Sequence, residues 1–188
     1  MSDWNLARNN LQSLLIEFVI ENDLDFLFIA EHSSIADDFI IQLNTLSPHT
    51  YKQLESGKCD KVKAFTRRSL STVGLASSSS RYAAYHVDIV QSIPPRKLLI
   101  FAVHLIDPYN HSLTTRSRYI LKLKASIEDT ERSLGSNNTL LIGDFNMNPH
   151  DYGISGVNYL GALNSKIAAK RNTIKYLDEE HSLFYNPT

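Results

Sequence analysis

The stretch Leu140–Pro149, which reads LLIGDFNMNP, carries the strongest signal in this chain of 188 residues. It begins as an apolar run and then presents Asp144 and Asn146, separated by one residue. The apolar run predicts a buried strand, and Gly143 and Pro149 mark its end. Because residues i and i+2 of an extended chain point to the same side, we expect the carboxylate and the carboxamide to project together. Such a pair suits a hard cation or a phosphate under attack by water.

The ends of two other apolar runs carry side chains of the same kind. Glu31 follows the run 25–30, which reads DFLFIA, and His104 follows the run LLIFAV, which begins at Leu98. Because open α/β sheets present functional groups at the ends of core strands, we expect these residues and Asp144 to form one set. A glutamate and an aspartate from separate strands can hold Mg²⁺, and a nearby histidine can donate a proton to a phosphate oxygen.

Each of these residues also has a simpler structural interpretation. Glu31 taken alone fits a solvated residue where a strand leaves the core, and His104 taken alone fits a satisfied histidine at a sheet edge. Asp144 and Asn146 could form an Asx turn that closes the strand. The functional interpretation depends on their common position, directly after apolar runs.

The composition is ordinary for a globular protein, with 43% hydrophobic and 21% charged residues. A chain of this length predicts one domain, residues 1–188, with a core of useful size. The formal net charge of −1 excludes binding to nucleic acid through bulk positive charge. If the protein handles phosphate groups, it must bind them locally, through a metal or a few arginines.

Cys59 is the single cysteine, so the chain can form neither an internal disulfide nor a cysteine zinc cluster. A packing residue in a reducing compartment fits this position. The N-terminus has no apolar signal region, and no segment approaches the length of a membrane span. We therefore expect a cytoplasmic protein with no membrane partner.

Apolar periodicity predicts helices alternating with strands. Helical spacing predicts helices around 11–19, around 39–43, at 113–134 and at 156–171. Apolar or alternating runs predict strands at 25–30, 61–66, 72–76, 82–90, 98–105 and 139–144, with a polar serine loop at 77–80. Sheets in the middle with helices outside make a layered α/β fold.

The sequence contains four short motifs in this order: WN at 4–5, AEH at 30–32, AVHL at 102–105 and GDFNMNP at 143–149. This order resembles the endonuclease/exonuclease/phosphatase superfamily, which includes pancreatic deoxyribonuclease, the apurinic endonucleases and inositol phosphatases. GDFN after an apolar strand is a specific signal, and the other motifs gain weight from their order and spacing. The resemblance implies a four-layered α/β sandwich that cleaves phosphate esters with Mg²⁺, or with Mn²⁺ in its place.

Carried over residue by residue, the resemblance implies a role for each matching side chain. Glu31 would be the principal metal ligand, and Asn5 would lie beside the metal and the scissile phosphate. His104 would contact the phosphate and take part in proton transfer. Asp144 would orient or deprotonate the attacking water, and Asn146 would stabilise the transition-state phosphate.

Two features fit the family less closely. Arg81 matches a phosphate-facing arginine of some members, although a surface arginine after a serine loop explains it equally well. Members also end with an Asp–His pair after a further strand, whereas here His181 follows Glu179 and Glu180. The chain therefore resembles a domain that is incomplete at its C-terminus. We expect self-association, or a partner chain, to cover the missing sheet edge.

The function that follows from the resemblance is hydrolysis of phosphodiester bonds with Mg²⁺, with nucleic acid as the favoured substrate and either endonuclease or exonuclease action. Two alternatives stay open. One is a catalytically inactive relic of the same fold that serves as an interaction module. The other is a phosphatase for inositol phosphates or other small molecules.

Overall fold

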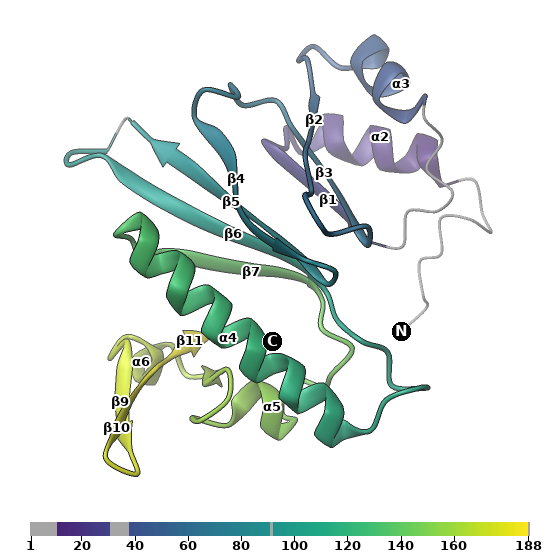
Figure 1. The fold of residues 1–188 in the computed structure, drawn as a ribbon. Helices are drawn as coiled ribbons and strands as arrows, with labels where there is room; N and C mark the ends of the chain where they lie inside the picture. The colour runs from purple at the N-terminus through teal and green to yellow at the C-terminus, as the bar shows by residue number, and fades with distance from the viewer. Residues whose placement is uncertain (1–10, 31–37, 91, 188) are drawn as a thin grey trace. The chain divides into compact units, whose positions relative to one another are not determined.

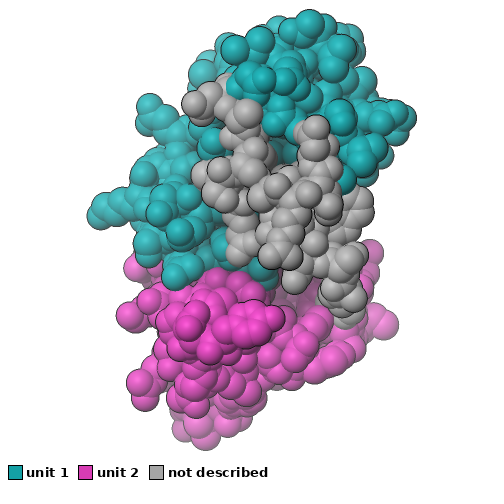
Figure 2. Space-filling view, turned by 90° about the vertical axis from the view of Figure 1, so that its right-hand side faces the viewer, with its two compact units in different colours: residues 1–104, 134–144 teal, residues 105–133, 145–188 magenta. Residues whose placement is uncertain are grey.

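The computed structural model describes residues 11–30, 38–90 and 92–187 (Figure 1). The chain divides into two compact units, coloured separately in Figure 2. Unit 1 comprises residues 1–104 and 134–144, and unit 2 comprises residues 105–133 and 145–188.

The first half of unit 1 is a three-stranded antiparallel sheet covered on one face by two helices. Its strand order is β1-β3-β2. The elements are α2 (Gln12–Glu21), β1 (Phe26–Ala30), α3 (Phe39–Leu46), β2 (Lys52–Leu54) and β3 (Val62–Thr66). A hydrophobic cluster joins the helices to the sheet; its buried members are Ile16, Val19, Leu27, Ile29, Phe39, Leu43, Tyr51 and Phe65. The predicted helices around 11–19 and 39–43 and the strands at 25–30 and 61–66 are confirmed.

The buried face of α2 differs from the stripe that helical spacing predicts, which is Leu11, Leu14, Leu15, Phe18 and Val19. Leu14 and Phe18 are exposed, whereas Ile16 and Val19 are buried. The helix carries apolar residues on more than one side, so apolar spacing alone allows several inward faces. Contact with β1 and α3 selects the face that is buried.

The second half of unit 1 is a four-stranded sheet in the order β4-β5-β6-β7. Its strands are β4 (Val73–Ser79), β5 (Tyr82–Ile89), β6 (Arg96–His104) and β7 (Thr139–Asp144). The first three strands are antiparallel, and β7 runs parallel to β6. The predicted loop at 77–80 is wrong for its first three residues, because residues 77–79 pair with the start of β5 and belong to β4.

The two sheets pack face to face through a second hydrophobic cluster. Phe28 of β1 contacts Tyr85 of β5, with ring centroids 5.9 Å apart. Ile100 and Ala102 of β6 belong to the same cluster. Alternation along β1 explains the two cores, since Phe28 faces the four-stranded sheet while Leu27 and Ile29 face the helices. Unit 1 is therefore a layered α/β structure: helices, one sheet, then the other.

Strand β7 lies at the edge of the described sheet, with β6 as its neighbour. Its side chains Leu140 and Ile142 are 47% and 42% exposed. The sequence predicts a buried strand at this position. The strand is confirmed, but the predicted burial is wrong. Leu140 pairs with Ile100 and Ile142 with Ala102, so both continue the face that the sheets share.

Unit 2 is built around the long helix α4 (Leu113–Leu134), which has the predicted bounds. Its buried apolar residues are Ile120, Leu123 and Ile127. The remaining elements are α5 (Tyr152–Ser155), β8 (Ala162–Leu163), α6 (Lys166–Ala169), β9 (Thr173–Tyr176), β10 (Glu179–Ser182) and β11 (Phe184–Tyr185). Strand β8 pairs with β11 in parallel, and β9 pairs with β10 in an antiparallel hairpin. No helix in the described ranges is both long and apolar enough to cross a membrane.

The prediction of one helix over 156–171 is wrong. This stretch forms turns, the short strand β8 and the single-turn helix α6. Gly161 interrupts it with a φ of 68°, a left-handed conformation that ends helices. Apolar spacing in this segment therefore reflects packing of turns rather than a helix face.

Candidate active site

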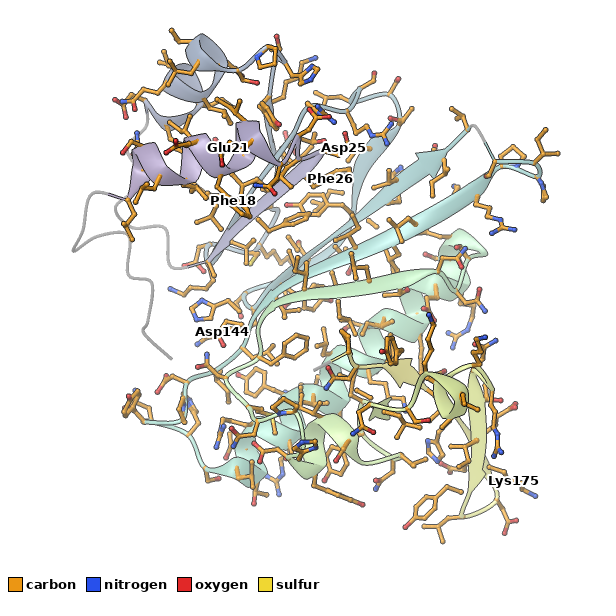
Figure 3. All side chains as sticks on the ribbon, turned by 180° about the vertical axis from the view of Figure 1, so that it is seen from behind. Phe18, Glu21, Asp25, Phe26, Asp144 and Lys175 are labelled. Atoms are coloured by element: carbon orange, nitrogen blue, oxygen red, sulfur yellow. The ribbon has the colours of Figure 1, made fainter. Side chains whose placement is uncertain are left out.

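The paired ends of β6 and β7 bring two predicted site residues together. His104 and Asp144 are the last matched pair of these parallel strands. The imidazole Nε2 of His104 lies 3.9 Å from Oδ2 of Asp144. The His104 side chain is 8% exposed and that of Asp144 is 50% exposed, so a buried imidazole stands beside an accessible carboxylate. Figure 3 shows Asp144 at the end of β7.

Gly143 allows the two strands to approach closely just before Asp144. Its φ is 130°, and a Cβ placed on it would lie 2.1 Å from the carbonyl oxygen of Val103. Any side chain at this position would clash with the backbone of β6, and backbone cannot move aside as a side-chain tip can. The glycine of the GDFN motif is thus required by the same strand pairing that places Asp144 next to His104.

Arg81 lies beside His104 at the turn between β4 and β5. The backbone N–H of His104 donates to the carbonyl oxygen of Arg81 at 2.9 Å. The Arg81 N–H donates in turn to Oγ of Ser79 at 3.2 Å. Arg81, His104 and Asp144 therefore occupy the same end of the four-stranded sheet in unit 1, and Arg81 is half-buried there.

Asn146 belongs to unit 2 and is held at both its side chain and its backbone. Its carboxamide Nδ2 donates to the carbonyl oxygen of Leu105 at 2.9 Å. Its own carbonyl oxygen accepts a hydrogen bond from Nη1 of Arg116. Its φ is 51°, a left-handed conformation, and β7 ends at Asp144. The expectation that both side chains project together from an extended chain is therefore wrong in its geometry.

Glu31 and Asn5, the other two predicted site residues, lie outside the described residues. The strand before Glu31 is described up to Ala30, and β1 contacts β7 of the facing sheet. The C-terminal end of β1 lies toward the end of unit 1 that carries Asp144 (Figure 3).

The loop after His104 contains a further organised turn that the sequence prediction missed. Asp107 Oδ1 accepts hydrogen bonds from the backbone N–H groups of Tyr109 and Asn110 and from the Asn110 carboxamide. The backbone hydrogen bond from Asn110 is the main reason that the pKa of Asp107 lies below its ordinary value. Its spacing from Asn110 is the local signal that could have found this Asx turn.

Among the described residues, Asp144 is the candidate for a metal-binding side chain at this sheet end. The described residues contain no group of three or more His, Cys, Asp or Glu side chains that could hold a metal ion. Asp144 offers a half-exposed carboxylate, and Mg²⁺ in proteins binds one or two carboxylates and fills its other positions with water and phosphate oxygens. The chemistry of Asp144 therefore fits one ligand position.

No protein-family model matches the sequence, and comparison with curated proteins finds no match. Solved structures do resemble it. The catalytic domain of human Nocturnin, solved with bound sulfate anion, has a TM-score of 0.54 at 13% identity, over 80% of this chain and 62% of that one. A mannosyl-6-phosphatase of Bacteroides thetaiotaomicron has a TM-score of 0.55 at 14% identity, over 78% and 60%.

A third structure, an endonuclease/exonuclease/phosphatase family protein of Bacteroides thetaiotaomicron, has a TM-score of 0.51 at 12% identity, over 78% of this chain and 57% of its own. The chain therefore spans less than two thirds of the length of these structures. At such identities the likeness concerns the fold. Together with the two packed sheets and the GDFN strand, it shows that this chain has the fold of the endonuclease/exonuclease/phosphatase superfamily.

Proposed function

We propose that this chain is a metal-dependent phosphoesterase that hydrolyses phosphodiester bonds, with residues 1–188 acting as a single domain. The observation that carries the proposal is the pairing of a buried imidazole with an accessible carboxylate at the ends of β6 and β7. Hydrolysis of a phosphodiester needs an oriented water, neutralised charge on the phosphate and help for the leaving oxygen. A carboxylate and an imidazole at one sheet end supply the first and the third.

Each residue has a definite task in this proposal. Asp144 orients or deprotonates the attacking water, and His104 contacts the phosphate and takes part in proton transfer. Asn146 stabilises the transition-state phosphate through its carboxamide. Glu31 is the principal ligand for Mg²⁺ or Mn²⁺, and Asn5 lies beside the metal and the phosphate. The bound metal would supply charge neutralisation on the phosphate.

Nucleic acid is the favoured substrate, with Arg81 facing a phosphate. The net charge of −1 implies that such a substrate is bound locally rather than by a broad basic surface. The mannosyl-6-phosphatase among the similar structures favours a second candidate, a phosphatase for small molecules such as inositol phosphates. A cytoplasmic location, expected from the sequence, is part of the proposal.

The first prediction concerns Glu31. Glu31→Gln is expected to lower Mg²⁺-stimulated cleavage of a generic phosphodiester or single-stranded DNA by at least about 100-fold, because the variant loses the charge that would hold the metal. Glu17→Gln, an exposed glutamate on α2, serves as the matched control and is expected to retain activity. The assay compares the rates of the two variants with that of the unmodified chain.

Absence of cleavage by the unmodified chain with either Mg²⁺ or Mn²⁺ would reject the enzyme proposal. It would favour the alternative that the chain is an inactive relic acting as an interaction module. The exposed apolar side chains of β7 are the observation that favours this inactive interaction module.

The second prediction concerns the edge of β7, which we propose is covered by a second copy or by a partner chain. An edge strand can pair with a strand of another chain, and β7 is an edge strand among the described residues; exposed Leu140 and Ile142 add apolar surface. We expect light scattering to show a species larger than the monomer of 21.3 kDa. Combining Leu140→Lys with Ile142→Lys should return it to the monomer.

The matched control changes two exposed apolar residues elsewhere. Ile41→Lys together with Leu46→Lys alters the outer side of α3 and is expected to leave association intact. A stable monomer for the unmodified chain at all concentrations tested would contradict this part of the proposal.

A further inference from the structure

Arg116, at the start of α4, contacts the loop that follows β7 through the backbone of Asn146. We infer that Arg116 is a positioning residue that fixes the carboxamide of Asn146 for contact with a phosphate. The inference rests on the proposed function, and it adds a residue outside every motif that the sequence pointed to. All of the contacts that carry it lie within unit 2.

The first observation is the contact itself. Nη1 of Arg116, in the first turn of α4, donates to the backbone carbonyl oxygen of Asn146. Arg116 is half-buried, and its Nε is buried with no hydrogen-bond partner among the described residues. Burying the Nε of a guanidinium without a hydrogen bond is costly, so the contact of Nη1 with the Asn146 carbonyl is the polar interaction that fixes this side chain.

The second observation is the conformation that this contact holds. Asn146 has a left-handed φ of 51°, a conformation that asparagine adopts more readily than most residues with a side chain, and the hydrogen bond from Arg116 holds the carbonyl oxygen of this turn. The carboxamide Nδ2 is fixed separately to the carbonyl oxygen of Leu105 at 2.9 Å. This bond orients the carboxamide group within unit 2.

The third observation is that the rest of the loop packs on the same turn of α4. A Cβ added to Gly153 would lie 2.7 Å from Cε of Met147 and 3.0 Å from Oγ of Ser117, the buried residue next to Arg116. Within the loop, the backbone N–H of Asn148 donates to Oδ2 of Asp151 at 2.9 Å. The loop is thus set against Arg116 and Ser117, and the backbone of Asn146 is its point of attachment.

A positioning role makes a specific kinetic prediction, because Arg116 should act only through Asn146. Arg116→Ala is expected to lower kcat by about 10-fold or more while KM changes by less than about twofold. The double variant with Asn146→Ala should be no slower than Asn146→Ala alone. Arg116→Lys keeps the charge without the planar fork and should restore part of the rate. Arg118→Ala, at an exposed position on the same helix, is the matched control and should keep full activity.

Two kinetic results would overturn the inference. If the effects of Arg116→Ala and Asn146→Ala multiply in the double variant, Arg116 acts independently of Asn146. If Arg116→Ala raises KM at constant kcat, Arg116 binds the substrate directly. Failure of the unmodified chain to cleave any substrate is a different result, and it rejects the proposed function.

A measurement without turnover tests the inference in either case. The side-chain NH₂ signals of Asn146, identified by their loss in Asn146→Ala, are expected to move to the positions of an unstructured amide in Arg116→Ala. They should stay in place in Arg118→Ala. Unmoved signals in Arg116→Ala would show that Arg116 does not position the carboxamide.

Discussion

Asp144→Asn is expected to lower kcat/KM for Mg²⁺-dependent phosphodiester cleavage by about 1,000-fold, within the range for loss of a general base. The substitution keeps the size and shape of the side chain and removes only its negative charge. An amide cannot accept a proton from water or hold a divalent cation as a carboxylate does. The measurement is cleavage under single-turnover conditions, together with a melting curve, which should hardly change because the side chain is 50% exposed.

Asp129→Asn is the matched control. Asp129 is an exposed carboxylate on α4, and its Oδ1 lies 2.8 Å from Nη1 of Arg132 in an ion pair. An exposed pair of this kind contributes less than about 1 kcal/mol, so the variant should retain both stability and activity. Equal rates for Asp144→Asn and Asp129→Asn would remove Asp144 from the chemistry.

Gly143→Ala is expected to cause the largest loss of stability of any single change considered. The new Cβ would lie 2.1 Å from the carbonyl oxygen of Val103, and the φ of 130° is strained for any L-residue with a side chain. Separating β6 from β7 would break the pairing next to His104 and Asp144. We expect the free energy of unfolding to fall by about 3 kcal/mol or more. Urea or thermal unfolding followed by circular dichroism measures this loss.

Gly135→Ala is the control that separates the cost of backbone strain from the cost of a steric clash. Gly135 also has a left-handed φ, 62°, but no atom lies within 4 Å of an added Cβ. Its substitution should cost about 1–2 kcal/mol, the intrinsic price of a left-handed residue. If Gly143→Ala were no more destabilising than Gly135→Ala, the result would contradict the close packing of β7 against the β6 backbone at Gly143.

Most of the fold of unit 1 could be predicted from the sequence because its elements carry strong periodicity. In β5, the alternation that buries Ala83, Tyr85 and Val87 identifies a strand with one face in the inter-sheet core. Helix α4 has its predicted bounds because Ile120 and Ile127 repeat at heptad spacing and no glycine or proline interrupts it. These signals are local, so they appear in the sequence itself.

The failures concern properties set by tertiary contacts. Leu140 and Ile142 were expected to be buried, yet exposure depends on which strands flank β7, and no local pattern encodes that. The segment 156–171 has helical apolar spacing, but Gly161 adopts a left-handed φ and the chain turns. In both cases the apolar pattern is present in the sequence, but the contacts made by the folded segment differ from those that the pattern predicts.

For the candidate site, the sequence predicts the positions of the residues at the strand ends better than the orientations of their side chains. Apolar runs that end in His104 and Asp144 were enough to place both at strand ends, and the strand register pairs them. The predicted orientation of Asn146 is wrong because its backbone is left-handed rather than extended, and its carbonyl oxygen accepts a hydrogen bond from Arg116, a residue 30 positions away in the chain. No motif marks Arg116, since its role arises only when α4 meets the loop after β7.

The proposed function requires Glu31, His104, Asp144 and Asn146 to surround a single divalent cation and its phosphate. Mn²⁺ added in small amounts to ¹⁵N-labelled protein tests this directly, because paramagnetic broadening reports which amides lie near the ion. We expect the signals of these four residues to broaden together, before those of exposed carboxylates such as Asp129, with Mg²⁺ reversing the effect. Broadening that spares Glu31 and Asp144, or that reaches only one of them, would contradict the account.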